Sequence, residues 1–148
     1  MASLWEFLWG KIYLTAVLLL LPLNLILAVA AKRRYQCRSV AHFAEIRHIP
    51  HHFVQLLNRG GVRATFFGLG TNPHWSECDV HLPRLANPIA AALRDTRILW
   101  TRVASHEVIH LHCMMGLSPY LWEVPLLKLM GRRIIAHFRG CEPGRAVL

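Results

Sequence analysis

The hydrophobic positions of this 148-residue chain follow two different patterns. Residues 12–31, IYLTAVLLLLPLNLILAVAA, form a twenty-residue apolar run without a charged side chain, whereas after residue 34 short apolar runs alternate with polar, glycine and proline stretches. At about 1.5 Å per residue, such a helix spans about 30 Å, the thickness of a bilayer's hydrocarbon core. The pattern predicts a membrane anchor with a cationic flank over residues 1–34 and a separate domain over residues 35–148.

The charges beside the run favour an uncleaved transmembrane helix over a cleaved signal peptide or a buried core helix. The flanking cations are Lys11 before the run and Lys32, Arg33, Arg34 and Arg38 after it. A signal peptide carries its positive charge before the apolar segment, and a buried helix rarely runs so long without a polar face. Because positive charge marks the cytoplasmic flank, we expect a single-pass membrane protein whose soluble part is cytoplasmic, with membrane lipids as partners.

Strand and helix patterns alternate after the anchor. Branched and aromatic runs indicate strands, and apolar residues at helical spacing indicate helices. The predicted strands are residues 37–43, 62–70, 107–113 and 132–138, and the predicted helices are residues 48–61, 87–105 and 119–131. The polar, proline-bearing stretch 71–83 supports no assignment. This order predicts an α/β fold, a partial Rossmann-like parallel sheet with flanking helices.

The predicted helices and the last strand carry expectations about packing. Asn87 is expected to cap the helix over residues 87–105, with Pro88 at its first position. Two apolar stripes are expected to face inward: Ile49, Phe53 and Leu56 or Leu57 in the first helix, and Ile89, Leu93, Trp100 and Val103 in the second. The strand over residues 132–138 reads as buried.

Charge and cysteine content narrow the function classes. The net charge of +9 comes partly from the cations after the apolar run, and the other arginines are scattered, so no nucleic-acid partner is predicted. The four cysteines, Cys37, Cys78, Cys113 and Cys141, form no CxxC pair. This spacing argues against a zinc or redox motif, and a cytoplasmic domain would keep four reduced thiols.

Histidines supply candidate chemistry within the sheet. In EVIHLHC, residues 107–113, His110 and His112 are two residues apart and so point to the same face of the strand. His137 from a neighbouring strand would complete a three-histidine metal site. Two histidines at this spacing are more typical of a hydrogen-bonded cleft wall, so no metal and no other cofactor is predicted. A metal-dependent histidine enzyme stays open because the chain has ten histidines.

The turn RGCEPG, residues 139–144, offers a second polar cluster. Glu142 supplies a carboxylate, and Gly140 lets the backbone approach a ligand closely. In parallel sheets ligands gather outside the carboxyl ends of the strands, so residues 68–72, 113–117 and 139–145 are expected to face one crevice. The alternative is that the glycines only turn the chain and Glu142 caps a following helix.

The segment EVIHLHCMMGLSPYLWEVPLLKLMGRRIIAHFRGCEPGR, from Glu107 onward, resembles the amino-terminal domain of GT-B-fold glycosyltransferases of the large retaining family 4. Those enzymes carry an acidic residue, a branched pair and histidines at the end of a strand, then a helix of PLLK type, then a strand closing on His-Gly-x-Asp-x-Arg. The matching stretches are VIHLH, PLLKLMGRRII, and Gly140, Glu142 and Arg145. Arg139 replaces the family's histidine, Glu142 its aspartate, and AEIRHIP its glycine-rich first loop.

This resemblance implies a membrane-anchored glycosyltransferase of which the chain is the amino-terminal piece, inactive without a second Rossmann-like domain. The intact enzyme would move a sugar from a nucleotide-sugar donor to a sugar or lipid-linked acceptor with retention of configuration. No catalytic residue is implied in this piece; the implied substrate-binding residues are His110, His112, His137, Gly140, Glu142 and Arg145. The alternative is a small non-catalytic membrane-anchored protein that binds a partner or lipid headgroups.

Overall fold

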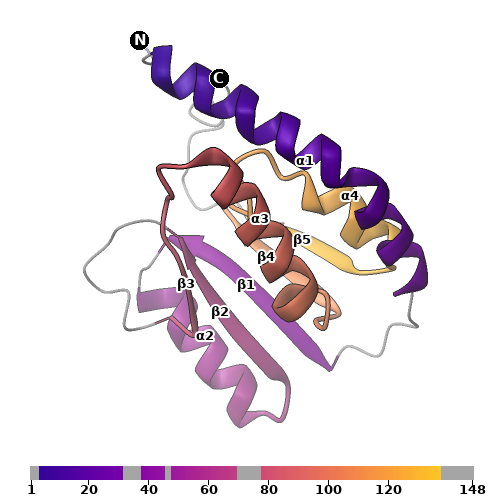
Figure 1. Ribbon diagram of the computed structural model, residues 1–148. Coiled ribbons are helices and arrows are strands. Elements are labelled where there is room, and N and C mark those ends of the chain that lie inside the picture. The colour runs from indigo at the N-terminus through magenta and orange to yellow at the C-terminus, as the bar shows by residue number, and fades with distance from the viewer. Residues whose placement is uncertain (1–3, 32–37, 46–47, 70–77, 138–148) are drawn as a thin grey trace.

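The computed structural model describes residues 4–31, 38–45, 48–69 and 78–137. The described strands are β1 (Ser39–Glu45), β2 (Arg63–Leu69), β3 (Val80–Leu82), β4 (Val108–His112) and β5 (Arg133–His137). The described helices are α1 (Leu4–Ala30), α2 (His48–Arg59), α3 (Pro88–Ile98), the π-helical turn η2 (Leu99–Val103) and α4 (Glu123–Leu129). The strands pair in parallel in the order β3-β2-β1-β4-β5, which confirms the predicted parallel α/β sheet (Figure 1).

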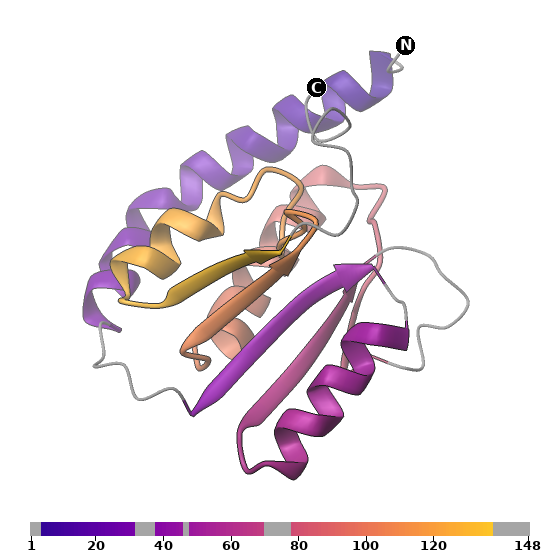
Figure 2. The same cartoon turned by 180° about the vertical axis from the view of Figure 1, so that it is seen from behind.

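Helices cover the two faces of the sheet unequally. On the front face, α3, η2 and α4 pack over a core that includes Phe43, Ile109 and Leu127, and α1 lies across α3 and α4 as an outer layer (Figure 1). On the back face, α2 covers β1 and β2 (Figure 2). Within the described ranges no helix covers β4 and β5 on this side. Part of the back face therefore lies outside the helical layers.

The element boundaries agree well with the pattern of the sequence. Each of the four predicted strands appears within two residues of its expected limits where it is described. The N-cap is also confirmed, because the Asn87 side-chain oxygen accepts hydrogen bonds from the amides of Ile89 and Ala90 at 2.9 and 3.1 Å. Strand β3 was not predicted. At three residues it is too short for a periodic signal, and Asp79 anchors it by accepting the Phe66 amide at 2.7 Å.

The predicted inward face of the helix over residues 87–105 is wrong in its first half and confirmed in its second, where Val103 is buried and Trp100 packs against the core. Ile89 and Leu93 are 51% and 54% exposed, whereas the small side chains Ala91 and Ala92 are buried together with Asp95. The reason is α1, which packs on α3 and needs small residues there for a close approach. The prediction from the sequence assumed that this helix packs only on the sheet, so it missed the contact with α1.

Two other packing expectations are also corrected. In α2, Phe53 and Leu56 are exposed, and Val54 is the buried residue, packed beside Ala64 and Phe66. Strand β5 is the edge of the described sheet rather than a buried strand, and Ile135 is 49% exposed. The exposure of Ile135 follows because no described helix covers β5 on the back face.

Helix α1 is fastened to the domain by buried polar side chains. The Tyr13 hydroxyl, fully buried, donates to Asp95 Oδ2 at 2.7 Å and accepts from Trp122 Nε1 at 2.8 Å. Further along the helix, Trp100 Nε1 donates to Asn24 Oδ1 at 2.6 Å. Buried groups of this kind are costly to leave unpaired, so the bonds favour one position of α1 against α3 and α4.

The opposite face of α1 is apolar and exposed. Its members include Leu19 at 79%, Ile26 at 67% and Leu18 at 63% exposure. By length and composition α1 is able to cross a membrane, as the sequence predicts. It also forms an interface with the domain, which a simple spanning segment would lack.

Replacing Tyr13 by Phe tests the docking of α1. The change removes the donor to Asp95 Oδ2 and the acceptor of Trp122 Nε1, so the free energy of unfolding should fall by about 1–3 kcal/mol. Denaturant titration in detergent micelles, followed by tryptophan fluorescence, measures it. Thr15→Ala is the control, because that exposed hydroxyl bonds only to Lys11 of the same helix. Equal effects of the two changes would contradict the docking.

Candidate functional site

Three neighbouring strands place four histidines on the back face of the sheet. His42 on β1 is the register partner of His110 on β4, and His112 on β4 is the register partner of His137 on β5. Register partners share a face, as do residues two apart in a strand, so all four side chains point the same way. We call this group the histidine cluster. Strands β4 and β5, which carry three of its members, lie beyond the part of the back face that α2 covers (Figure 2).

The imidazole rings of the cluster are in mutual contact. The Nδ1 atoms of His42 and His110 are 3.1 Å apart, and the His110 and His112 ring centroids are 4.1 Å apart. His137 stands at the rim, with its centroid 5.6 Å from His112 and 5.7 Å from His110. The parallel strands thus bring together side chains that are separated by up to 95 positions in the sequence.

Burial keeps the inner part of the cluster uncharged. His42 and His112 are 3% and 4% exposed, whereas His137 is exposed. Burial, followed by the repulsion of His110 and His112, lowers the pKa of His42 to about 3. His42 is therefore neutral at pH 7. Its Nε2 atom is buried and has no hydrogen-bond partner among the described residues, which costs about 1–3 kcal/mol in a folded protein.

The structure accounts for only part of the predicted site. It brings His110, His112 and His137 together, whereas Gly140, Glu142 and Arg145 lie outside the described residues. Analysis of the sequence missed His42. Its signal is present in SVAHFAE, where it sits among small and apolar residues, but only the pairing of β1 with β4 places it opposite His110.

The loop that joins β4 to α4 is locked by a buried carboxylate. Glu123 accepts hydrogen bonds from the Ser118 hydroxyl at 2.6 Å and from the Ser118 amide at 3.3 Å. Gly116 lies so close to Glu123 and Leu121 that a Cβ atom there would collide with both. Burial raises the pKa of Glu123, while the bonds from Ser118 act in the opposite direction. This loop follows the carboxyl end of β4, beside the point where the strand order reverses.

Cys113, at the start of this loop, contradicts the prediction of four reduced thiols. It is disulfide-bonded. Disulfides persist mainly in oxidising compartments. The bond therefore does not fit the reducing surroundings expected of a cytoplasmic domain.

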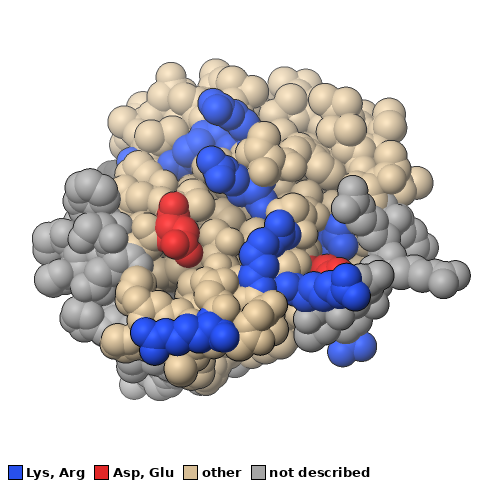
Figure 3. All heavy atoms as spheres, turned by 90° about the horizontal axis from the view of Figure 1, so that it is seen from below, with Lys and Arg blue, Asp and Glu red and all other residues tan. Residues whose placement is uncertain are grey.

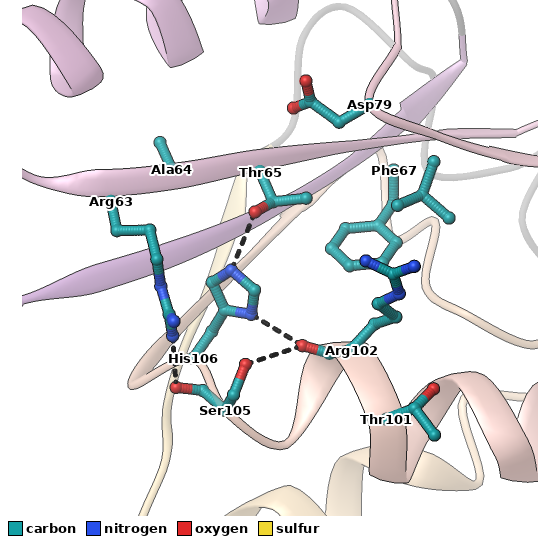
Figure 4. A pocket seen from close by; sticks show the side chains of 10 residues that line it. Arg63, Ala64, Thr65, Phe67, Asp79, Thr101, Arg102, Ser105 and His106 are labelled. Atoms are coloured by element: carbon teal, nitrogen blue, oxygen red, sulfur yellow. Dashed lines mark hydrogen bonds between the residues drawn. The ribbon is translucent and has the colours of Figure 1, made fainter.

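A cavity of about 450 Å³ opens on the front face near the amino-terminal ends of β2 and β3 (Figure 4). His106 lies inside it, with Nδ1 3.0 Å from the Arg102 carbonyl oxygen and Nε2 2.9 Å from the Thr65 hydroxyl. A carbonyl only accepts, so Nδ1 carries the proton and Nε2 accepts from Thr65. Burial lowers the pKa of His106, which favours this neutral form. These bonds satisfy both ring nitrogens, so the histidine has a structural role.

Positive charge gathers at the amino-terminal edge of the sheet. Arg38 precedes β1, Arg63 begins β2 and Arg133 begins β5 (Figure 3). Arginines that are distant in the sequence thus share one end of the molecule, because the starts of β1, β2 and β5 each contribute one. The histidine cluster lies farther along the strands, toward the opposite edge.

Comparisons of the chain with family models, with curated proteins and with solved structures find no match. The resemblance to glycosyltransferases therefore depends on the residues named above.

The buried carboxyl of Glu123 predicts a pH dependence of stability. Because its folded-state pKa is raised, its contribution is fully present below the unfolded pKa and is lost as pH rises through the folded value. Glu123→Gln keeps a neutral acceptor for Ser118, so the free energy of unfolding should decline less between pH 4 and pH 8 than in the parent. Denaturant titrations across this range measure the slope. Glu6→Gln, on the surface of α1, should keep the parent slope; an unchanged slope in Glu123→Gln would contradict the assignment.

Proposed function

We propose that the chain is the amino-terminal, acceptor-side domain of a membrane-associated retaining glycosyltransferase. The supporting observation is the parallel sheet that holds His112 and His137 at the carboxyl ends of β4 and β5, beside the reversal of strand order between β1 and β4. In open parallel sheets that edge is the usual ligand site. Neutral imidazoles both donate and accept hydrogen bonds, as sugar hydroxyls require.

The position of α1 supports an acceptor that is itself held in the membrane. The outer face of α1 has no charged side chain between Ile12 and Ala30, and it would be unfavourable in water. Its inner face is fixed to α3 and α4 by hydrogen bonds. We therefore propose that α1 lies along the membrane surface, with its outer face in the lipid and its inner face on the domain.

The same helix brings the ligand edge of the sheet close to the lipid. The β4–α4 loop reaches α1, where Tyr120 packs over Gly10 and Trp122 bonds to Tyr13. A Cβ atom at position 10 would collide with the Tyr120 hydroxyl, so this contact is close. A sugar carried on a lipid would then reach the loop without leaving the membrane.

Two aspartates on the outer face of α1 test the membrane contact. In Leu19→Asp with Ile26→Asp, each exposed apolar side chain becomes a charge, and partition onto phospholipid vesicles should fall by more than about 10-fold. Co-sedimentation with vesicles measures it. The matched control places the same two charges on α2, as His52→Asp with Gln55→Asp, and should bind like the parent. Equal loss in both proteins would indicate a general charge effect and contradict the proposed orientation.

The sugar-transferase proposal is tested by binding of a lipid-linked sugar acceptor in nanodiscs, with sugar-free nanodiscs as reference. The full chain should bind the sugar-bearing discs more tightly, and His137→Ala should reduce that difference by about 10-fold, since one hydrogen bond to a buried ligand is worth about 0.5–1.5 kcal/mol. His52→Ala, an exposed histidine on α2, is the control.

The result separates the two functions that the sequence leaves open. Equal binding to both kinds of disc would overturn the glycosyltransferase; sugar transfer is not measured, because this domain alone is expected to be inactive. It would favour the alternative, a non-catalytic membrane-binding protein, because the apolar face of α1 serves that function equally well.

A further inference from the structure

Three members of the histidine cluster are arranged as a ligand set. One ring nitrogen from each of His42, His110 and His112 lies within 4.8 Å of the others. On a tetrahedral zinc ion, with bonds of about 2.0–2.1 Å, ligand nitrogens lie about 3.3 Å apart. The His42 and His110 Nδ1 atoms, 3.1 Å apart, already have that separation. The His112 ring, with its centroid 4.1 Å from that of His110, supplies the third nitrogen.

The chemistry of the cluster favours a cation over plain packing. A single proton shared between the Nδ1 atoms of His42 and His110 explains the approach of those two rings, yet it does not involve His112, whose ring nitrogen belongs to the same group. A metal ion would engage one lone pair from each of the three rings. Neutral imidazole is the form that binds metals.

We propose that His42, His110 and His112 form a three-histidine site for a divalent transition-metal ion of the zinc class. The set contains nitrogen ligands alone, which suits Zn²⁺, Co²⁺, Ni²⁺ or Cu²⁺ and not Mg²⁺ or Ca²⁺, which prefer oxygen. Three protein ligands leave one coordination position for water or a substrate atom. That position faces the rim, where His137 stands 5.6 Å from His112.

The site shares His110 and His112 with the residues expected to bind the sugar acceptor, so its test reads metal content, which does not depend on sugar transfer. It uses the full chain in detergent, purified with a tag that contains no histidine and stripped with a chelator. Zn²⁺ is measured by elemental analysis, and Co²⁺ by its visible absorption. We expect one ion per chain and the intense visible bands of tetrahedral Co²⁺.

Single changes of the ligands should weaken Co²⁺ binding. His110→Ala and His112→Ala should each raise the dissociation constant more than about 100-fold, since even outer-shell changes cost about 10–100-fold. Two controls should bind like the parent: His106→Gln, a buried histidine on the front face, and His51→Ala with His52→Ala, on α2. Loss of binding in the α2 variant, with retention in His110→Ala, would overturn the proposal.

The variant His110→Cys distinguishes a true loss of metal binding from misfolding. His110→Cys supplies a thiolate in place of an imidazole and should add a sulfur-to-cobalt charge-transfer band in the near ultraviolet, which the parent lacks. A misfolded protein would not gain this band. Absence of the band in a variant with parental circular dichroism would overturn the proposal, as would a parent chain that binds neither ion stoichiometrically.

Discussion

The hydrogen bond from Tyr13 to Asp95 is the constraint on which the arrangement of this molecule depends. It joins α1 to α3 across a dry interface, and Trp122 extends the same network to the start of α4. Burial raises the pKa of Asp95, while the bond from Tyr13 and the pairing with Arg94 offset part of that effect. The network thus decides which face of α1 is exposed and which face packs on the domain.

Much of the fold was predictable because each strand and helix of a parallel sheet leaves a recognisable pattern in its own stretch of the sequence. Alternating apolar runs located β1, β2, β4 and β5, and Asn87 with Pro88 located the start of α3. Helix faces were not predictable, because Ala91 and Ala92 pack against α1, a partner some 75 residues away in sequence. Strand β3 was not predicted, because three residues are too few to show an alternating pattern.

The candidate site was predictable only where its residues share a strand. His110 and His112 are two apart, and their common face follows from strand geometry alone. His42 joins them only because β1 lies between β2 and β4, and strand order is not encoded in any local pattern. The same reason explains the basic edge, where arginines from separate strand starts meet. The basic edge and the histidine cluster both result from the order in which the strands pair, and neither is contained in a single segment of the sequence.

The network around Tyr13 also has a consequence for biogenesis. Tyr13 lies 82 positions before Asp95 and 109 before Trp122, so a ribosome releases the apolar α1 long before the surface that receives it. During that interval both faces of α1 are uncovered, which is the situation in which nascent chains aggregate. Helix α1 can therefore reach its final position only after the residues of α3 and α4 have been synthesised.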